Sequence, residues 1–291
     1  MTATADNRVI VEAWNTVLFD KFTRYKHLLV AGLSGHSNEA LRRHPHPKGA
    51  RVLDIGCGFG DSTLKIAEQV APSGEAVGVD CAANFIAQAE QGAQQQGLSN
   101  ARFFVADVQT EDLRGPYDFA FARFGTMFFN LPGAAMRNIF RALRPGGKLT
   151  MIVWRKREDN PWLHEAELRV KELVPLVSHE ETNQVHCGPG PFSMSGPDLV
   201  SDLLQSAGFD QITFERFDTD ICIGRDLDEA VRFAMDLGPA GEIIRLAGEE
   251  GDKRKPQVIT ALREVLGPFV RPDGVWGPSS TWFVSARRPA G

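Results

Sequence analysis

The chain has 291 residues, of which 43% are hydrophobic and 24% charged, a composition typical of a folded globular protein rather than a disordered one. Its net charge of −5 argues against a nonspecific nucleic-acid binder, which normally carries a surplus of basic residues. Residues 124–136, a stretch without a charged residue, are too few for a membrane span, which takes about 20 residues. The sequence starts without an apolar signal core, and we therefore expect a cytoplasmic protein.

The N-terminal part, residues 1–48, is expected to be mostly helical and to form a cap. From there to residue 154, short apolar segments alternate with segments of helical periodicity. The expected strands of this part are residues 51–55, 76–79, 102–105, 117–122 and 148–154. The alternation predicts a doubly wound α/β fold, in which helices cover both faces of a parallel sheet.

The regular alternation stops after residue 154. Helices are expected at residues 161–176, 197–207, 226–237 and 257–266, and strands at 211–223 and 280–286. The charged stretch 249–255 is interpreted as a solvated loop. About two helices would then lie between residues 224 and 277, inserted between the last two strands.

A glycine-rich loop, GCGFG, follows the first expected strand and precedes the first helix of the alternating region. Its glycines, Gly56, Gly58 and Gly60, let a ligand press against the backbone of a nucleotide-type pocket. The third glycine of the dinucleotide fingerprint G-x-G-x-x-G would fall on Asp61, a carboxylate beside the expected pyrophosphate, which argues against NAD. The phosphate-binding sequence G-x-x-x-x-G-K-[ST] is also missing from the chain.

Three acidic residues lie at the ends of successive expected strands: Asp54, Asp80 and Asp107. The carboxyl ends of parallel strands share one edge of a sheet, so these side chains are expected to line one crevice. Asp80 is placed to accept hydrogen bonds from ribose hydroxyls, Asp107 from an adenine amino group, and Asp54 to act near a cationic amine. A ligand with adenosine at one end and positive charge at the other fits this set, and S-adenosylmethionine is such a ligand.

Four motifs in order support this interpretation: VLDIGCGFG at residues 52–60, GVD at 78–80, ADV at 106–108 and LRPGGKL at 143–149. The series resembles that of class I S-adenosylmethionine-dependent methyltransferases, and is similar to their ubiquinone/menaquinone-biosynthesis-type small-molecule branch. The resemblance implies a Rossmann-like seven-stranded sheet that ends in an antiparallel hairpin. Residues 49–291 would form the methyltransferase domain, with helical insertions at 155–196 and 224–278 that cap the substrate.

The resemblance also implies the cofactor-binding residues. They are Asp54, Gly56, Cys57, Gly58, Gly60, Asp80, Cys81, Phe85, Asp107, Val108, Arg123 and Phe124. The glycine loop and Asp54 would hold the methionine end, Asp80 the ribose, and Asp107 with Val108 the adenine. Arg123 and Phe124 would close the site after the fourth strand.

Candidates for contact with the methyl acceptor are weaker. His186, which precedes a Gly/Pro loop, and His164 are candidate general bases, although each alone is more often a surface or supporting residue. Trp14, Tyr25 and Phe128 are candidate substrate contacts, for which ordinary core packing is the alternative. No metal site is expected, and the four cysteines, which have no C-x-x-C spacing, are interpreted as reduced thiols: Cys57, Cys81, Cys187 and Cys222.

The predicted function is methyl transfer from S-adenosylmethionine to an O, N, C or S atom of a small molecule, with S-adenosylhomocysteine as product. Such an enzyme works mainly by alignment and desolvation. The alternative is a regulatory or scaffold protein that binds an S-adenosyl ligand without catalysis. A nucleic-acid acceptor is opposed by the charge balance, and the chain is expected to be a monomer or a homodimer.

Overall fold

The computed structural model describes residues 7–175 and 189–291, and these form one mixed sheet in the order β3-β2-β1-β4-β5-β8-β6. The first five strands of this order are parallel. Strand β8 is antiparallel to both of its neighbours, β5 and β6, so β6 runs in the same direction as the first five strands. The strands are β1 (Arg51–Ile55), β2 (Glu75–Asp80), β3 (Ala101–Val105), β4 (Tyr117–Arg123), β5 (Leu143–Trp154), β6 (Asp210–Gly224) and β8 (Gly274–Arg287). Every strand expected from the sequence is present, which confirms the α/β class and the antiparallel hairpin.

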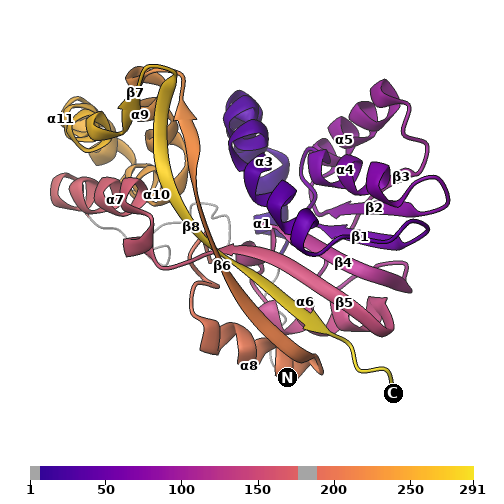
Figure 1. The fold of residues 1–291 in the computed structure, drawn as a ribbon. Coiled ribbons are helices and arrows are strands. Elements are labelled where there is room, and N and C mark those ends of the chain that lie inside the picture. Colours follow the sequence, from indigo (N-terminus) through magenta and orange to yellow (C-terminus); the bar gives the residue numbers. More distant parts are fainter. Residues whose placement is uncertain (1–6, 176–188) are drawn as a thin grey trace.

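Helices cover both faces of the sheet, as expected for strands that are buried on both sides (Figure 1). One layer contains α3 (Lys26–Arg43), α4 (Asp61–Val70) and α5 (Ala83–Gln96), and the other contains α6 (Pro132–Ala142) and α8 (Pro197–Ala207). The core between these layers includes Leu53, Ile66 and Phe121, each almost fully buried.

The last two strands extend beyond the sheet. Strand β5 pairs with β8 only as far as Thr281, whereas β8 and β6 stay paired up to Val275 and Gly224. This two-stranded arm leads to a group of helices that lies away from β1–β3 (Figure 1). The group comprises α7 (Pro161–Leu173), α9 (Leu227–Asp236), α10 (Gly238–Leu246) and α11 (Gly248–Leu266), and we call it the cap.

Two expectations for the cap are wrong. The segment between β6 and β8 contains three helices rather than two, together with a short strand, β7 (Val270–Arg271), that adds an eighth strand to the described sheet. Residues 249–255 are helical within α11 rather than a loop. Their charges pair one turn apart, Glu250 with Lys253 and Asp252 with Lys255, which supports a solvated helix face. The same helix buries Val258 and Leu262, and this burial holds it in place.

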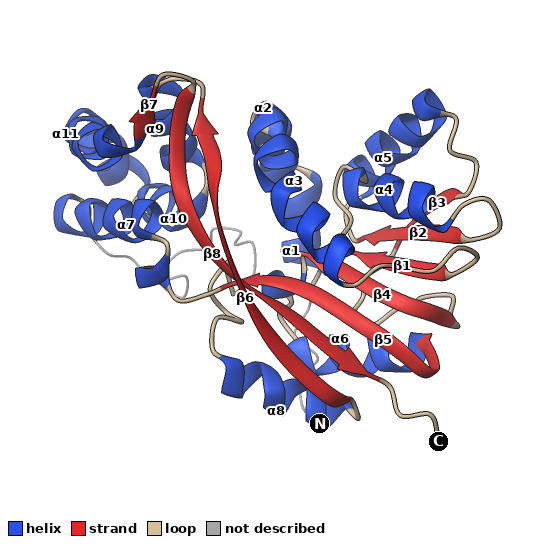
Figure 2. Cartoon of the chain, in the orientation of Figure 1, coloured by secondary structure: helices blue, strands red, loops and turns tan. Residues whose placement is uncertain are grey.

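The N-terminal region is helical over its described part, as expected. Helices α1 (Arg8–Asn15) and α2 (Val17–Arg24) precede α3, which packs against β5 and β6. In Figure 2, α2 and α3 lie between the cap and the layer of α4 and α5. None of the helices within residues 7–175 and 189–291 is long and apolar enough to cross a membrane.

Candidate functional site

A cavity of about 710 Å³ opens at the carboxyl ends of β1, β2 and β4 and continues under α1 and α2 to the cap. This edge includes the switch point between β1 and β4, where open α/β sheets bind their ligands. Ten of the twelve predicted cofactor-binding residues line the cavity. They are Gly56, Cys57, Gly58, Asp80, Cys81, Phe85, Asp107, Val108, Arg123 and Phe124.

The glycine loop leaves room for a ligand. A side chain at Gly58 would meet no atom within 4 Å, so the missing Cβ leaves open space at the cavity wall. Gly58 also has a φ of +53°, which disfavours other residues. At the neighbouring position, a Cβ on Gly56 would lie 3.1 Å from the Cα of Gly125, so the loops after β1 and β4 meet through two glycines.

Asp80 at the end of β2 joins this loop to the next one. Its Oδ2 accepts a hydrogen bond from the Gly58 N–H at 3.0 Å, and its Oδ1 accepts one from the Ala82 N–H at 3.0 Å. Burial raises the pKa of the Asp80 carboxyl, and the backbone N–H donors oppose that shift. The carboxylate therefore fixes the shape of the loop and still lines the cavity.

Asp107 occupies the corresponding place after β3. Its Oδ1 accepts the Gln109 N–H at 2.9 Å, and its Oδ2 accepts a bond from the Asn7 side chain at 2.9 Å. Oδ1 also accepts a bond from the Gln109 side-chain amide at 3.0 Å, so it is Oδ2 that keeps capacity for a further donor. Nearby, Phe85 packs edge-on against Phe59, with ring centroids 4.9 Å apart. This side of the cavity therefore combines hydrogen-bond acceptors with an aromatic wall.

An ion pair that the sequence did not predict lies in the cavity wall. Arg123 donates from Nη2 to Oδ1 of Asp61 at 2.8 Å, and its Nη1 lies 2.8 Å from Oδ2. The two side chains are only 11% and 16% exposed, and both line the cavity. The signal available in the sequence was the acidic residue directly after the glycine loop, which was used there only to argue against NAD.

Asp54, by contrast, lies behind the cavity wall. It is 1% exposed and is not among the residues that line the cavity. Its Oδ2 accepts bonds from the hydroxyls of Ser62 and Thr63, at 2.7 and 2.6 Å, which fastens β1 to α4. Burial raises the pKa of Asp54 to about 6. Gly60 also lies outside the lining, and its role as a ligand contact, like that of Asp54, stays a prediction.

Of the residues expected to contact the methyl acceptor, the structure places two in the cavity lining and two outside it. Trp14 and Phe128 line the cavity and contact each other edge to face, with centroids 5.1 Å apart. His164 lies on α7 but is not among the lining residues, and Tyr25 is buried beside the cavity with its hydroxyl bound to Asp236. His186 lies outside the described residues, and so does Cys187.

The cap end of the cavity has aromatic rings and several charged side chains, some of which form a cluster. Trp154, Trp162, Phe192 and Phe233 contribute rings to its lining. The cluster is centred on Glu167 of α7, which is nearly buried and pairs with Arg157 at 2.9 Å and Lys171 at 2.6 Å. No sequence pattern marks these three charged residues, because their meeting depends on how α7 packs.

A buried histidine supports the wall from behind. His36 on α3 is 0% exposed, its ring contacts Phe124 and Trp154, and its Nε2 lies 3.0 Å from the Ser279 hydroxyl. Phe124 itself has a φ of +60°, an uncommon conformation for a bulky residue, and it stacks on Trp154 at 4.8 Å. The surroundings of His36 thus hold a strained residue against the cavity.

Burial lowers the pKa of His36 from 6.5 to about 4, which makes its contribution to stability pH-dependent. Below pH 6.5 the unfolded chain binds a proton at this position that the folded chain refuses, so stability is lost as the pH falls. At pH 4.5 we expect this to cost roughly 2–3 kcal/mol. We therefore expect the free-energy difference between wild type and His36→Phe to shrink by that amount between pH 7 and 4.5.

Urea unfolding at the two pH values measures this difference. Asp54 and His46 also titrate in this range, but they are common to both proteins and cancel in the comparison. An equal difference at pH 7 and pH 4.5 would contradict a buried neutral His36.

Comparisons with known proteins agree with this geometry. A methyltransferase domain family matches residues 46–215. A demethylmenaquinone methyltransferase of Geobacillus is 28% identical over 117 residues, which cover 39% of this chain and 49% of that protein. A nocamycin O-methyltransferase of Saccharothrix syringae is 30% identical over 179 residues, which cover 58% of this chain and 61% of that protein. The match thus spans about half or somewhat more of each relative.

The fold is also shared with solved structures. The YcgJ protein of Bacillus subtilis superposes with a TM-score of 0.57 at 17% identity, covering 88% of this chain and all of that protein. At this identity the similarity shows the fold alone.

Proposed function

This chain belongs to the methyltransferase domain family, and from that premise we propose that it transfers the methyl group of S-adenosylmethionine to a small molecule. Family membership confirms the resemblance found in the sequence. The observation that carries the proposal is the single cavity that gathers the glycine loop, Asp80 and Asp107 at the ends of three adjacent strands. S-adenosylmethionine supplies the activated methyl group, and the protein supplies binding, orientation and a dry cavity.

The adenosine half of the ligand fits the wall between β2 and β3. Asp80 accepts hydrogen bonds from the ribose hydroxyls while it keeps its two backbone donors. Asp107 accepts from the adenine amino group, and Phe85 lies at the ring's edge. The open space at Gly58 lets the ligand approach the loop backbone.

The amino-acid half fits the ion pair. An α-carboxylate and an α-ammonium match Arg123 and Asp61, which face each other across 2.8 Å at the cavity wall. We assign the methionine end to this pair rather than to Asp54, whose Oδ2 is already bound by two hydroxyls. The pair offers one charge of each sign to a ligand end that also carries one of each.

The acceptor lies toward the cap. Aromatic walls at Trp14, Phe128, Trp154 and Trp162 favour an apolar or aromatic molecule and exclude water around it. The cytoplasmic location, the exclusion of nucleic acid as acceptor, and the monomeric or dimeric state stay predictions of the sequence.

Formation of S-adenosylhomocysteine tests the enzymatic function. We expect the purified protein to form this product from S-adenosylmethionine when it is supplied with a panel of phenols, quinols, amines and thiols. Both named relatives are methyltransferases, which supports catalysis over the ligand-binding alternative. Calorimetric binding of the cofactor with no product from any acceptor class would favour the non-catalytic protein instead.

A further inference from the structure

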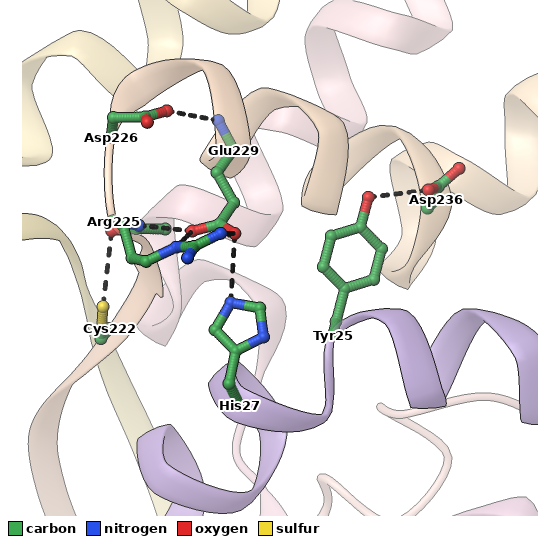
Figure 3. A network of polar contacts seen from close by, with 8 residues as sticks. Tyr25, His27, Cys222, Arg225, Asp226, Glu229 and Asp236 are labelled. Carbon is green, nitrogen blue, oxygen red and sulfur yellow. Dashed lines mark hydrogen bonds and ion pairs between the residues drawn. The ribbon is translucent and has the colours of Figure 1, made fainter.

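Asp236, the last residue of α9, lines the cavity and joins the cap to the N-terminal helices. Its Oδ2 accepts a hydrogen bond from the Tyr25 hydroxyl at 2.7 Å and one from Arg24 Nη1 at 2.9 Å. Its main-chain oxygen accepts a bond from Lys21 Nζ at 2.9 Å. Figure 3 shows the Tyr25 hydroxyl directed at the Asp236 carboxylate from the neighbouring helix.

The arrangement brings together two helix C-termini. Helix α2 ends at Arg24 and α9 ends at Asp236, and the carbonyl ends of two helices, together with a carboxylate, repel one another when unpaired. Lys21 and Arg24 offset this negative charge, and Tyr25 adds a neutral donor. These three donors therefore stabilise the contact.

The donors differ in strength. The Arg24 side chain is 64% exposed, so its ion pair with Asp236 is screened by water and contributes little. Tyr25 is 3% exposed and packs its ring against Phe233 of α9, with centroids 5.2 Å apart. Of the two side chains that donate to the Asp236 carboxylate, the buried tyrosine is thus the stronger partner.

The two sides cover different halves of the cavity. Helices α1 and α2 contribute Trp14, Leu18 and Phe22 to the lining, and Phe22 packs against the ring of Phe85 on the adenine side. Helix α9 contributes Phe233 and Asp236 at the cap end. A contact that joins α2 to α9 therefore connects the helices that cover the cofactor half of the cavity with those that cover the acceptor half.

A second link strengthens this junction. His27, at the start of α3, lies with its Nε2 3.1 Å from Oε1 of Glu229, a buried residue of α9 that Arg225 also holds (Figure 3). This link is more distant from the cavity, because neither His27 nor Glu229 lines it. It joins α9 to α3 independently of the Tyr25–Asp236 contact.

We propose that Tyr25 and Asp236 form a latch that holds α2 against α9, so that its opening sets how fast ligand leaves the cavity. The proposal rests on the proposed function, since the ligand in question is the S-adenosyl cofactor or its product. Tyr25 acts as a positioning residue, because it does not line the cavity itself. It acts by holding α2, whose residues line the cavity, against α9.

The test compares Tyr25→Phe with Tyr117→Phe. Tyr25 and Tyr117 are the two tyrosines of the chain, and Tyr117 is equally buried but donates to Leu113 at the far end of β4. Stopped-flow displacement measures the dissociation rate of S-adenosylhomocysteine. Loss of one buried hydrogen bond predicts a rate about five- to tenfold faster for Tyr25→Phe and an unchanged rate for Tyr117→Phe.

Two further variants locate the effect. Asp236→Ala should speed release at least as much as Tyr25→Phe, and the double variant should equal Asp236→Ala, because both changes break one contact. Asp228→Ala removes the ion pair of the same helix with Arg263, which lies away from the cavity, and should leave the rate unchanged. Equal rates for Tyr25→Phe, Tyr117→Phe and Asp228→Ala would overturn the latch.

Hydrogen exchange on the ligand-free protein separates this proposal from the proposed function. We expect faster amide exchange in residues 17–24 of Tyr25→Phe, and unchanged exchange there in Tyr117→Phe. If the wild type binds no S-adenosylhomocysteine, the proposed function fails, while the exchange data still decide whether the latch holds α2. Unaltered exchange in residues 17–24 would count against the latch whatever the ligand.

Discussion

Asp80→Ala is expected to weaken S-adenosylhomocysteine binding by about tenfold or more, because a charge-assisted hydrogen bond contributes roughly 1.5–3 kcal/mol. The change also removes the acceptor of the hydrogen bonds from the Gly58 and Ala82 N–H groups, so the conformation of the glycine loop is less well fixed. Isothermal titration calorimetry measures the dissociation constant directly. An unchanged constant would remove Asp80 from the ribose site.

A matched control lies at the other end of the strands. Asp118 of β4 also accepts a backbone N–H, that of Arg51 at 2.7 Å, but it does not line the cavity. Asp118→Ala should lower the melting temperature and leave the affinity unchanged. If both variants weaken binding equally, the effect comes from lost stability and not from the site.

Arg123→Met is expected to weaken S-adenosylhomocysteine binding by about tenfold, since it removes the cation assigned to the carboxylate and leaves Asp61 unpaired at the wall. Adenosine has no amino-acid end, so its affinity should stay unchanged in this variant. Competition binding with the two ligands measures both effects on one protein.

The two variants together give a crossed result. Asp80→Ala should weaken both adenosine and S-adenosylhomocysteine, whereas Arg123→Met should weaken only the latter. Equal loss of both ligands in Arg123→Met would mean that the ion pair with Asp61 merely shapes the loop, and the methionine end would then need another site.

The parallel half of the fold could be predicted because its signals are local. Each strand is a short apolar run, and each is followed within a few residues by a glycine or an acidic residue. The cap was harder, because amphipathic helices and charged loops resemble each other in sequence. Glu250 and Lys253 are three residues apart, a spacing that allows an ion pair on a helix and therefore favours a helix over a loop at residues 249–255.

That a crevice lies at the strand ends followed from the sequence alone, because parallel strands bring their carboxyl ends, and with them Asp80 and Asp107, to one edge. Which acidic residue faces that crevice was decided only by packing. Asp54 accepts hydrogen bonds from Ser62 and Thr63 behind the cavity wall. Asp61 instead pairs with Arg123, 62 positions later in the chain. The contact between α2 and α9 depends still more on tertiary structure, since Tyr25 and Asp236 are 211 positions apart. Local patterns determine strands and their end residues, whereas contacts between distant segments exist only once the helices have packed.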